Sequence, residues 1–365
     1  MHIDAISTPA LIVDTDRIRA NIARWQSHAK QYGVSLRPHI KTHKSIEIAR
    51  MQQAAGANGI TAAKLSEAEC FVDAGWHDVF VAYPIIGIDK CRHAARLAKK
   101  CRLTVAVDSL VGIVQLATVA ADAQVIIVVR IEVDSGLHRC GVHPEQVMPL
   151  VEAIQSAPNL QFDGLFTYRG AWFAGANGRT PAELGREEGE LLVHVANNIQ
   201  QSGIPVTSVS VGSTPTGMAA ATVPGVTEIR PGTYVFGDDM QIFAQSCTPS
   251  QVALSILCTV ISRPDDTTAT IDAGSKTFSG DVNFERMGLA GYATAVDYDA
   301  TLVRMSEEHG VLKVAPGVDL PIGTRIAMRP IHVCTTVNLS DELYFYDSFT
   351  SECTPIKIVA RGKRW

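Results

Sequence analysis

The strongest constraint on the fold is a recurrence of short apolar runs, rich in β-branched residues, separated by segments with helical periodicity. Helical patterns such as Ser45–Ala55, Ser66–Ala74 and Pro181–Gln201 lie between the runs. Several runs are apolar throughout rather than alternating, which is typical of parallel strands covered on both faces. The runs occupy residues 34–40, 59–64, 78–83, 103–108, 125–132, 161–167, 206–211 and 226–230.

Eight such βα units predict a closed parallel (β/α)8 TIM barrel covered by helices. A doubly wound open sheet is the alternative. A further strand over Pro9–Asp14 and a helix over Asp14–Tyr32 are expected before the first unit. Because 365 residues exceed the usual size of a single core, a second part of the molecule is also expected.

The sequence changes character after about residue 245, where short alternating runs separated by Gly, Pro and Asp replace the helical pattern. This predicts a mostly antiparallel β-domain. We expect residues 1–245 to form the barrel and residues 246–365 to form the β-domain. The strands expected there are Val252–Arg263, Thr268–Ala273, Val311–Val314, Arg325–Pro330 and Leu343–Asp347.

Composition excludes several classes of function. A net charge of −5 without a long basic run argues against nucleic acid or an anionic membrane as a partner. No apolar run approaches the roughly 20 residues that span a bilayer, and the first residues lack the pattern of a signal peptide. Eight cysteines without CxxC spacing indicate neither a disulfide framework nor a zinc ribbon. A cytoplasmic location is expected.

Two histidines and two lysines, His39, Lys41, His43 and Lys44, end the first predicted barrel strand. Active sites of such barrels lie at the carboxyl ends of the strands. Lys41 is therefore either a solvated strand end or a functional amine. Lys44, one turn into the next helix, is expected on the solvated face. Other strands end in Lys64, Tyr83, Asp108, Arg139, Tyr168, Arg169 and Arg230, which indicates an anionic ligand.

Two loops of small residues, Gly212-Ser213-Thr214 and Gly232-Thr233-Tyr234, follow the last two predicted strands. Loops at these positions often hold phosphate through backbone N–H and hydroxyl donors. Each loop alone could be an ordinary turn, but the pair predicts a phosphate site. A lysine facing such loops predicts a Schiff base with a phosphorylated aldehyde cofactor.

These motifs, with the Asp134–Gly141 segment and the residues around Lys41, together resemble the fold-type III pyridoxal-phosphate enzymes, which include alanine racemase. The sequence is more similar to the D-threonine aldolase and D-serine dehydratase group, over nearly the whole chain. The resemblance implies an alanine racemase-like barrel, pyridoxal 5'-phosphate as cofactor and a homodimer.

The resemblance also implies roles for particular residues. Lys41 looks like the lysine that binds the cofactor and later moves protons at Cα. Arg139 is similar to the arginine that contacts the phenolic oxygen of the cofactor. Arg230 lies where the racemases place an arginine facing the pyridine nitrogen, a contact that is less uniform in the aldolase and dehydratase branch. The residues that look like the phosphate cup are Gly212, Ser213, Thr214, Gly232, Thr233 and Tyr234.

The β-domain contains a His-x-Cys sequence, His332-Val333-Cys334. In an extended segment residues i and i+2 face the same way, so His332 and Cys334 could approach one ion. A structural histidine and a buried cysteine would give the same sequence. The resemblance implies a divalent metal here, because the group carries His-x-Cys or His-x-Asp at this place. A thiolate favours zinc, with manganese or magnesium as alternatives.

The resemblance implies a lyase that uses pyridoxal phosphate and a divalent metal to act on D-3-hydroxy amino acids. Dehydration of D-serine or D-threo-3-hydroxyaspartate would give a keto acid and ammonia, whereas retro-aldol cleavage would give glycine and an aldehyde. Cys334 resembles the dehydratase branch, since aldolases carry aspartate there. Residues 167–174 also lack the histidine that is a candidate base in aldolases. The sequence therefore narrowly favours a dehydratase.

Tyr168, Arg169 or a metal-bound water could substitute for that histidine, or Arg169 could instead bind a second carboxylate of the substrate. Three other classes of protein remain possible from the sequence. A racemase would use the same cofactor site with a second base and no metal. A non-catalytic cofactor carrier would lack the β-domain, and a metal-free structural protein would not bind the cofactor.

Overall fold

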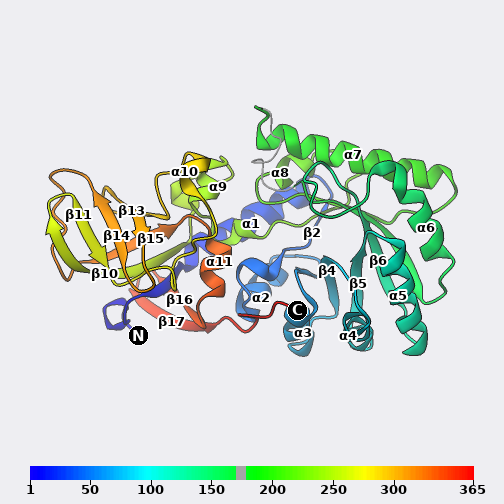
Figure 1. The fold of residues 1–365 in the computed structure, drawn as a ribbon, viewed down its shortest axis with the longest axis horizontal. Coiled ribbons are helices and arrows are strands. Elements are labelled where there is room, and N and C mark those ends of the chain that lie inside the picture. The colour runs from blue at the N-terminus through cyan, green and yellow to red at the C-terminus, as the bar shows by residue number, and fades with distance from the viewer. Residues whose placement is uncertain (170–177) are drawn as a thin grey trace. The chain divides into compact units, whose positions relative to one another are not determined.

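Eight parallel strands form one sheet in the computed structural model, which describes residues 1–169 and 178–365 (Figure 1). Their order is β2-β9-β8-β7-β6-β5-β4-β3. The strands are β2 (Ser35–Leu36), β3 (Ile60–Ala62), β4 (Asp78–Pro84), β5 (Arg102–Val107), β6 (Ile127–Glu132), β7 (Leu160–Phe166), β8 (Ser208–Val211) and β9 (Glu228–Ile229).

The two end strands of this sheet also meet. His39 and Thr61 form a parallel bridge, and the Thr61 N–H donates to the Pro38 carbonyl at 2.8 Å. The sheet therefore closes, and the predicted barrel is confirmed. Each of the eight strands lies where an apolar run predicts one.

Helices cover the outer face of this barrel, as their alternation with the strands predicts (Figure 1). The longest, α7 (Pro181–Gln201), begins with a capping box in which Thr180 and Glu183 exchange hydrogen bonds and proline takes the first helical position. The others are α1 (Thr15–Gln31), α2 (Ile46–Ala54), α3 (Leu65–Asp73), α4 (Ile88–Ala98), α5 (Leu110–Asp122), α6 (Val147–Gln155) and α8 (Gly217–Ala220).

The barrel strands carry a closed ring of alternating charges, in which four members are buried and two, Asp78 and Arg102, are partly exposed. Successive partners in the ring lie 2.6–3.5 Å apart. Three of the six residues are the first residues of their strands, so the ring lies toward the end opposite the predicted site. In order around the ring, the members are Arg37, Asp78, Arg102, Asp163, Arg130 and Glu228.

A second sheet has the strand order β11-β14-β13-β12-β15-β10-β1-β16-β17. An additional pairing of β10 with β11 closes six antiparallel strands, so the mostly antiparallel β-domain is confirmed. The strands are β1 (Ala10–Asp14), β10 (Leu254–Asp265), β11 (Thr268–Ile271), β12 (Ala293–Ala295), β13 (Ala300–Met305), β14 (Gly310–Val314), β15 (Arg325–Pro330), β16 (Glu342–Asp347) and β17 (Glu352–Lys357).

Strand β1 belongs to this second sheet, where it pairs antiparallel with β10 and parallel with β16. Three strands, β12, β13 and β17, have no counterpart among the runs expected from the sequence. Short helices connect the strands of this part of the chain: α9 (Asp239–Phe243), α10 (Phe284–Met287) and α11 (Val333–Asn338). Within the described residues, the 3₁₀ helices are η1 (Ile3–Ala5), η2 (Ile40–Thr42), η3 (Pro144–Gln146), η4 (Thr233–Val235) and η5 (Pro249–Gln251).

The described chain divides into two compact units whose limits differ from the expected 1–245 and 246–365. Unit 1 comprises Met1–Ala23, Thr42–Ile48 and Thr233–Gly362, and it contains the second sheet. Unit 2 comprises Arg24–Lys41, Ala49–Gly232 and Lys363–Trp365, and it contains the barrel. The assignment of cofactor binding to one part and metal binding to the other remains a prediction.

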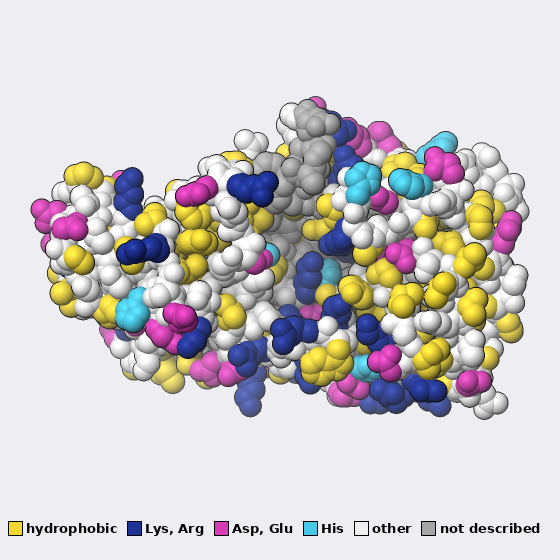
Figure 2. Space-filling model, viewed as in Figure 1, with side chains coloured by type: hydrophobic (Ala, Val, Ile, Leu, Met, Phe, Trp, Pro, Cys, Tyr) yellow, Lys and Arg dark blue, Asp and Glu magenta, His cyan; other side chains and the backbone are white. Residues whose placement is uncertain are grey.

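The surface carries charges of both signs, in agreement with the small net charge of −5. Figure 2 shows basic and acidic side chains interspersed over the visible faces of both units. Within the part of the chain that the structure describes, no helix has the length and apolar character needed to cross a bilayer.

Candidate active site

Three of the predicted site residues come together in unit 2, at the carboxyl ends of the barrel strands. Lys41 lies in η2, directly after β2, and its backbone N–H donates to His39 Nδ1 at 3.4 Å. Its Nζ lies 5.8 Å from the centre of the Tyr168 ring, and the guanidinium carbon of Arg139 lies 4.8 Å from the same ring. Tyr168 therefore has two cationic groups beside it, one of which is the predicted cofactor lysine.

Lys44 is not on the solvated face, contrary to the expectation from the sequence. Its side chain is buried and donates to the Ala360 carbonyl at 3.3 Å. The helix α2 begins only at Ile46, and Lys44 precedes it in the left-handed region with φ 52°. This turn directs the side chain inward, so the amphipathic pattern of the helix does not apply to Lys44.

Arg139 is held by a loop that Asp134 organises. The Asp134 carboxylate accepts from the N–H groups of Gly136 and His138 at 2.9 and 3.1 Å, and from the His138 ring at 2.8 Å. Burial raises the pKa of Asp134, but these hydrogen bonds outweigh it and lower the pKa below its usual value. Asp134 therefore acts as an anionic anchor for the loop that carries Arg139.

Glu132, the last residue of β6, is a buried acid that the sequence reasoning missed. Burial raises its pKa to about 7, against the opposing effects of Arg139 and Arg230. The sequence does contain a pattern that could have predicted Glu132: an acid within an apolar run, two residues after Arg130 and therefore on the same face of the strand. Its position beside Arg139 places a titratable group at the predicted cofactor site.

The first predicted phosphate loop follows β8 in a tightly turned conformation. Gly212 has φ 85°, and a Cβ there would lie 2.8 Å from the Gly217 Cα, so only glycine fits. The Gly212 N–H donates to Glu188 Oε1, and the Ser213 N–H donates to Thr216 Oγ1. Glu188 is fully buried, and burial raises its pKa.

The second predicted phosphate loop follows β9, the neighbour of β8 in the barrel. Gly232 is the last residue of the segment Ala49–Gly232 of unit 2. Thr233 and Tyr234 lie in η4 and belong to unit 1. There the Thr233 hydroxyl lies 3.6 Å from the sulfur of Cys334, and Tyr234 is buried. The role of all six predicted residues in phosphate binding remains a prediction.

Arg230 lies inside the barrel. Its Nη1 donates to Ser210 Oγ at 2.6 Å and its Nη2 donates to the Thr167 carbonyl at 2.7 Å. The guanidinium also lies 5.2 Å from the centre of the Phe166 ring. Burial lowers the pKa of Arg230 to about 10. Both terminal nitrogens thus bind the barrel wall, and a contact with the pyridine nitrogen stays a prediction.

Arg169 follows Tyr168 after the end of β7, and its Nη1 donates to the Ser135 carbonyl. This places its guanidinium beside the loop that carries Arg139. The rest of the segment in which the sequence lacks a histidine, residues 170–174, lies outside the described residues. That argument against an aldolase therefore rests on the sequence alone.

The His-x-Cys segment is not extended throughout, so that expectation was wrong. His332 has extended dihedrals, with φ −137° and ψ 102°, but Cys334 lies in the first turn of α11. The helix forms because the buried Asp238 carboxylate accepts from the Val333 N–H at 3.0 Å and the Thr336 hydroxyl donates to the His332 carbonyl at 2.9 Å. Within unit 1 the two side chains nevertheless lie close together, since Cys334 is among the groups that raise the pKa of His332.

Polar side chains from three other segments of unit 1, Thr42, Thr233 and Asp281, surround this pair. The Cys334 sulfur lies 3.3 Å from the Thr42 hydroxyl as well as near Thr233. Burial lowers the pKa of His332, but hydrogen bonds to Asp281 and Cys334 outweigh it and raise the pKa to about 11. Among residues 1–169 and 178–365, no group of three or more His, Cys, Asp or Glu side chains could hold a metal ion.

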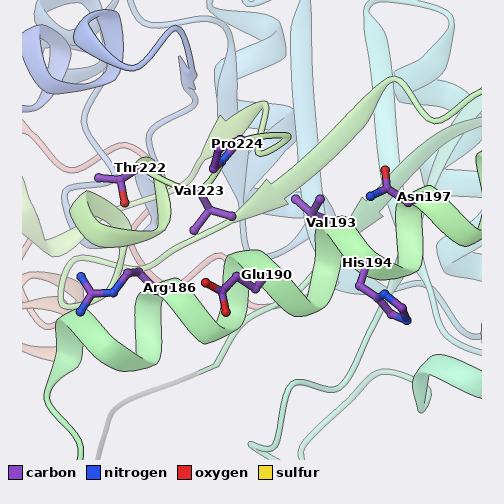
Figure 3. Close-up of a pocket in the computed structure, with 8 residues that line it drawn as sticks. All are labelled: Arg186, Glu190, Val193, His194, Asn197, Thr222, Val223 and Pro224. Carbon is purple, nitrogen blue, oxygen red and sulfur yellow. The ribbon is translucent and has the colours of Figure 1, made fainter.

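A separate cavity of about 420 Å³ lies on the outside of unit 2, against α7 (Figure 3). Side chains from Arg186 to Asn197 on the helix and from Thr222 to Pro224 line it. It contains none of the predicted site residues.

Two family models match successive parts of the chain. Residues 13–240 match the model of the alanine racemase N-terminal domain, and residues 253–346 match that of a serine dehydratase domain. The chain is 35% identical to D-threo-3-hydroxyaspartate dehydratase of Delftia sp. (strain HT23), over 91% of this chain and 92% of that protein. The chain therefore belongs to the family that combines an alanine racemase N-terminal domain with a serine dehydratase domain and includes D-threo-3-hydroxyaspartate dehydratase.

Members of the family with different activities resemble the chain to a similar degree. It is 32% identical to D-threonine aldolase of Arthrobacter sp, over 93% of this chain and 88% of that protein. A solved structure of a D-threo-3-hydroxyaspartate dehydratase cysteine variant in the metal-free form has a TM-score of 0.89 and 31% identity, covering 100% of both chains. The resemblance inferred from the motifs is confirmed, and with it membership of a pyridoxal phosphate-dependent family of lyases.

Proposed function

We propose that this protein dehydrates D-3-hydroxy amino acids of the D-serine or D-threo-3-hydroxyaspartate type, using pyridoxal phosphate and a divalent metal. The hydroxyl leaves Cβ as water after a proton leaves Cα, and hydrolysis of the product then yields the keto acid and ammonia. The observation that carries the proposal is the contact of His332 with Cys334 at the start of α11. In D-threo-3-hydroxyaspartate dehydratase, the histidine and the cysteine replaced in solved variants also stand two positions apart.

The barrel residues fit the cofactor. When bound, pyridoxal phosphate supplies a ring that withdraws electrons and makes the Cα proton of an attached amino acid acidic. Lys41 would bind its aldehyde and, once released by the substrate amine, would hold the Cα proton on Nζ. Arg139, beside the Tyr168 ring, is positioned by the Asp134 loop to bind an anionic oxygen. The loops after β8 and β9 would receive the phosphate.

The His332 and Cys334 side chains would hold the metal, for which zinc is favoured and manganese or magnesium are alternatives. A metal at this place supplies Lewis-acid polarisation of the substrate β-hydroxyl. Arg169 would bind the second carboxylate of a dicarboxylic substrate such as 3-hydroxyaspartate, because a guanidinium pairs with carboxylate in two-point geometry. We also infer that the protein is a homodimer and is located in the cytoplasm. Light scattering of the purified protein tests the dimeric state.

Aldol cleavage is the second candidate function, and the similarity to D-threonine aldolase over most of both chains favours it. The same Lys41 and the same metal pair would serve it, but the Cα–Cβ bond would break to give glycine and an aldehyde. An amino-acid racemase is the less favoured reading, because it would make no use of His332 and Cys334.

The products distinguish these functions. Purified protein should be incubated with D-serine, D-threonine and D-threo-3-hydroxyaspartate, with EDTA and after addition of zinc or manganese. We expect keto acid and ammonia without glycine, loss of activity with EDTA, and recovery with metal. His332→Ala should lower activity at least about 100-fold, whereas His309→Ala, an exposed turn residue of unit 1, should not. Glycine with aldehyde would show an aldolase instead, and turnover indifferent to both EDTA and His332→Ala would exclude the metal role.

A further inference from the structure

The His332 ring is bonded through one of its two nitrogens to a carboxylate that is distant in the sequence. His332 Nδ1 lies 2.8 Å from Asp281 Oδ2. Asp281 belongs to the loop between β11 and α10, which carries no motif. Its other oxygen, Oδ1, accepts from the Thr335 hydroxyl at 3.1 Å and from the Ser279 hydroxyl. The carboxylate is thus fixed from both sides while it holds the imidazole.

The identity of the bonded nitrogen decides what the other one can do. When Nδ1 donates its proton to a carboxylate, the neutral ring keeps a lone pair on Nε2, which is the form that binds a metal. Histidine ligands in metal sites almost always donate their second nitrogen in this way, and the partner fixes the tautomer and orientation of the ring. Asp281 provides this arrangement for His332.

The other carboxylate near His332 is not available for this role. Asp238 is fully buried, and its Oδ1 and Oδ2 accept from the N–H groups of Gln241 and Val333. Asp281, by contrast, is 41% exposed and directs one oxygen at the ring. Asp281 is half-exposed, and the Ser279 and Thr335 hydroxyls hold it against the His332 ring. A purely structural role would not require this arrangement.

We propose that Asp281 is a positioning residue for a divalent cation at His332 and Cys334, acting by holding the His332 ring through Nδ1. This inference rests on the proposed function, since it presupposes the metal pair. Asp281 would not contact the cation or the substrate. Its effect would be on how tightly the ion binds and on the orientation of the imidazole.

The test measures zinc affinity rather than turnover. The full-length protein with bound pyridoxal phosphate is freed of metal with EDTA, dialysed, and titrated with zinc in competition with a chromogenic chelator. Asp281→Asn keeps the shape but removes the charge, and we expect it to weaken binding about 10-fold; Asp281→Ala should weaken binding up to about 100-fold. Thr335→Val, which removes one donor to Asp281, should have a smaller effect of a few-fold.

Asp266→Asn, in the exposed turn between β10 and β11, is the matched control and should leave the affinity unchanged. The visible absorbance of the cofactor and the unfolding midpoint of each metal-free variant should match those of the wild type, which separates lost affinity from lost fold. If His332→Ala lowers zinc affinity but both Asp281 variants bind as tightly as wild type, the positioning role is overturned and the metal pair stands. If His332→Ala binds zinc like wild type, the metal site of the proposed function fails, and this inference with it.

Discussion

At the scale of single residues, the barrel site combines cations with one acid that holds its proton more tightly than an ordinary carboxyl does. Lys41 and Arg139 lie beside the Tyr168 ring, and Glu132 is buried near Arg139 at the end of β6. A buried carboxyl favours its neutral form because ionisation in a poorly solvated place is costly. Glu132 is therefore one residue through which pH acts on the stability of the cofactor-free barrel.

Because the pKa of Glu132 in the folded chain, about 7, is above its value in an unfolded chain, the folded protein binds the extra proton. Its contribution is fully favourable below the unfolded pKa and is lost as pH rises toward 7. We expect Glu132→Gln to stabilise the cofactor-free protein at pH 8 by about 3 kcal/mol at most, and to change it little at pH 4.5. Chemical unfolding at both pH values measures this.

Glu145→Gln, in the exposed η3 turn, is the control for this prediction and should behave as wild type at both pH values. An equal effect of Glu132→Gln at pH 4.5 and pH 8 would contradict the raised pKa, since it would indicate a packing effect alone.

At the scale of elements, α11 decides the geometry of the His332 and Cys334 side chains. The helix begins immediately after His332, and Asp238 serves two helix starts at once: it is the N-cap of α9 through Gln241 and holds the first N–H of α11 through Val333. Each bond uses a different carboxylate oxygen. A single buried side chain thus ties the direction of α11 to α9.

Replacement of Asp238 should therefore lower the free energy of unfolding, by an amount that depends on how many of the two hydrogen bonds are lost. Asp238→Asn keeps one acceptor oxygen, so we expect a loss of about 1 kcal/mol, whereas Asp238→Ala loses both bonds and should cost about 2–3 kcal/mol. Denaturant unfolding of the metal-free protein is the measurement. Asp341→Asn removes only an exposed ion pair with Arg361 and should change stability little. Equal losses for Asp238→Asn and Asp238→Ala would mean that the two bonds do not act separately.

At the scale of the whole molecule, the barrel depends on the charged ring as well as on apolar packing. Glu228 accepts from Arg37 Nε at 2.7 Å and from Arg130 Nη1 at 2.6 Å. Burial raises the pKa of Glu228, but the two guanidinium groups outweigh it and hold the pKa well below its usual range. These contacts join β9 to β6 and to the end of β2, across the interior.

Removal of one charge from this ring leaves buried cations without a partner, so we expect Glu228→Gln to cost about 3–5 kcal/mol. Because the folded pKa of Glu228 is depressed, its contribution is present above the unfolded pKa of about 4.5 and is lost as pH falls further. The difference between wild type and Glu228→Gln should therefore shrink below pH 4, measured by thermal unfolding. Glu190→Gln, exposed on α7, is the control, and a difference that persists at low pH would contradict the ion pairing.

The sequence by itself determined the alternation of eight strands with helices and the motifs that carry Lys41, Arg139 and the small-residue loops. It could do so because strand and helix periodicity, and the φ values that glycine allows, are set within a few neighbouring residues. The same local patterns predicted the antiparallel second part. They also identified the family, since its motifs are contiguous in the chain.

Only the tertiary structure decided which side chains distant in the sequence meet. Lys44 is buried because it bonds to Ala360, and Cys334 is helical because Asp238 caps α11. Asp281 reaches His332 from 51 residues away, and β1 joins the sheet of β10 rather than the barrel. No local pattern encodes these contacts, because each depends on the burial of polar groups between segments that approach one another only in the folded chain.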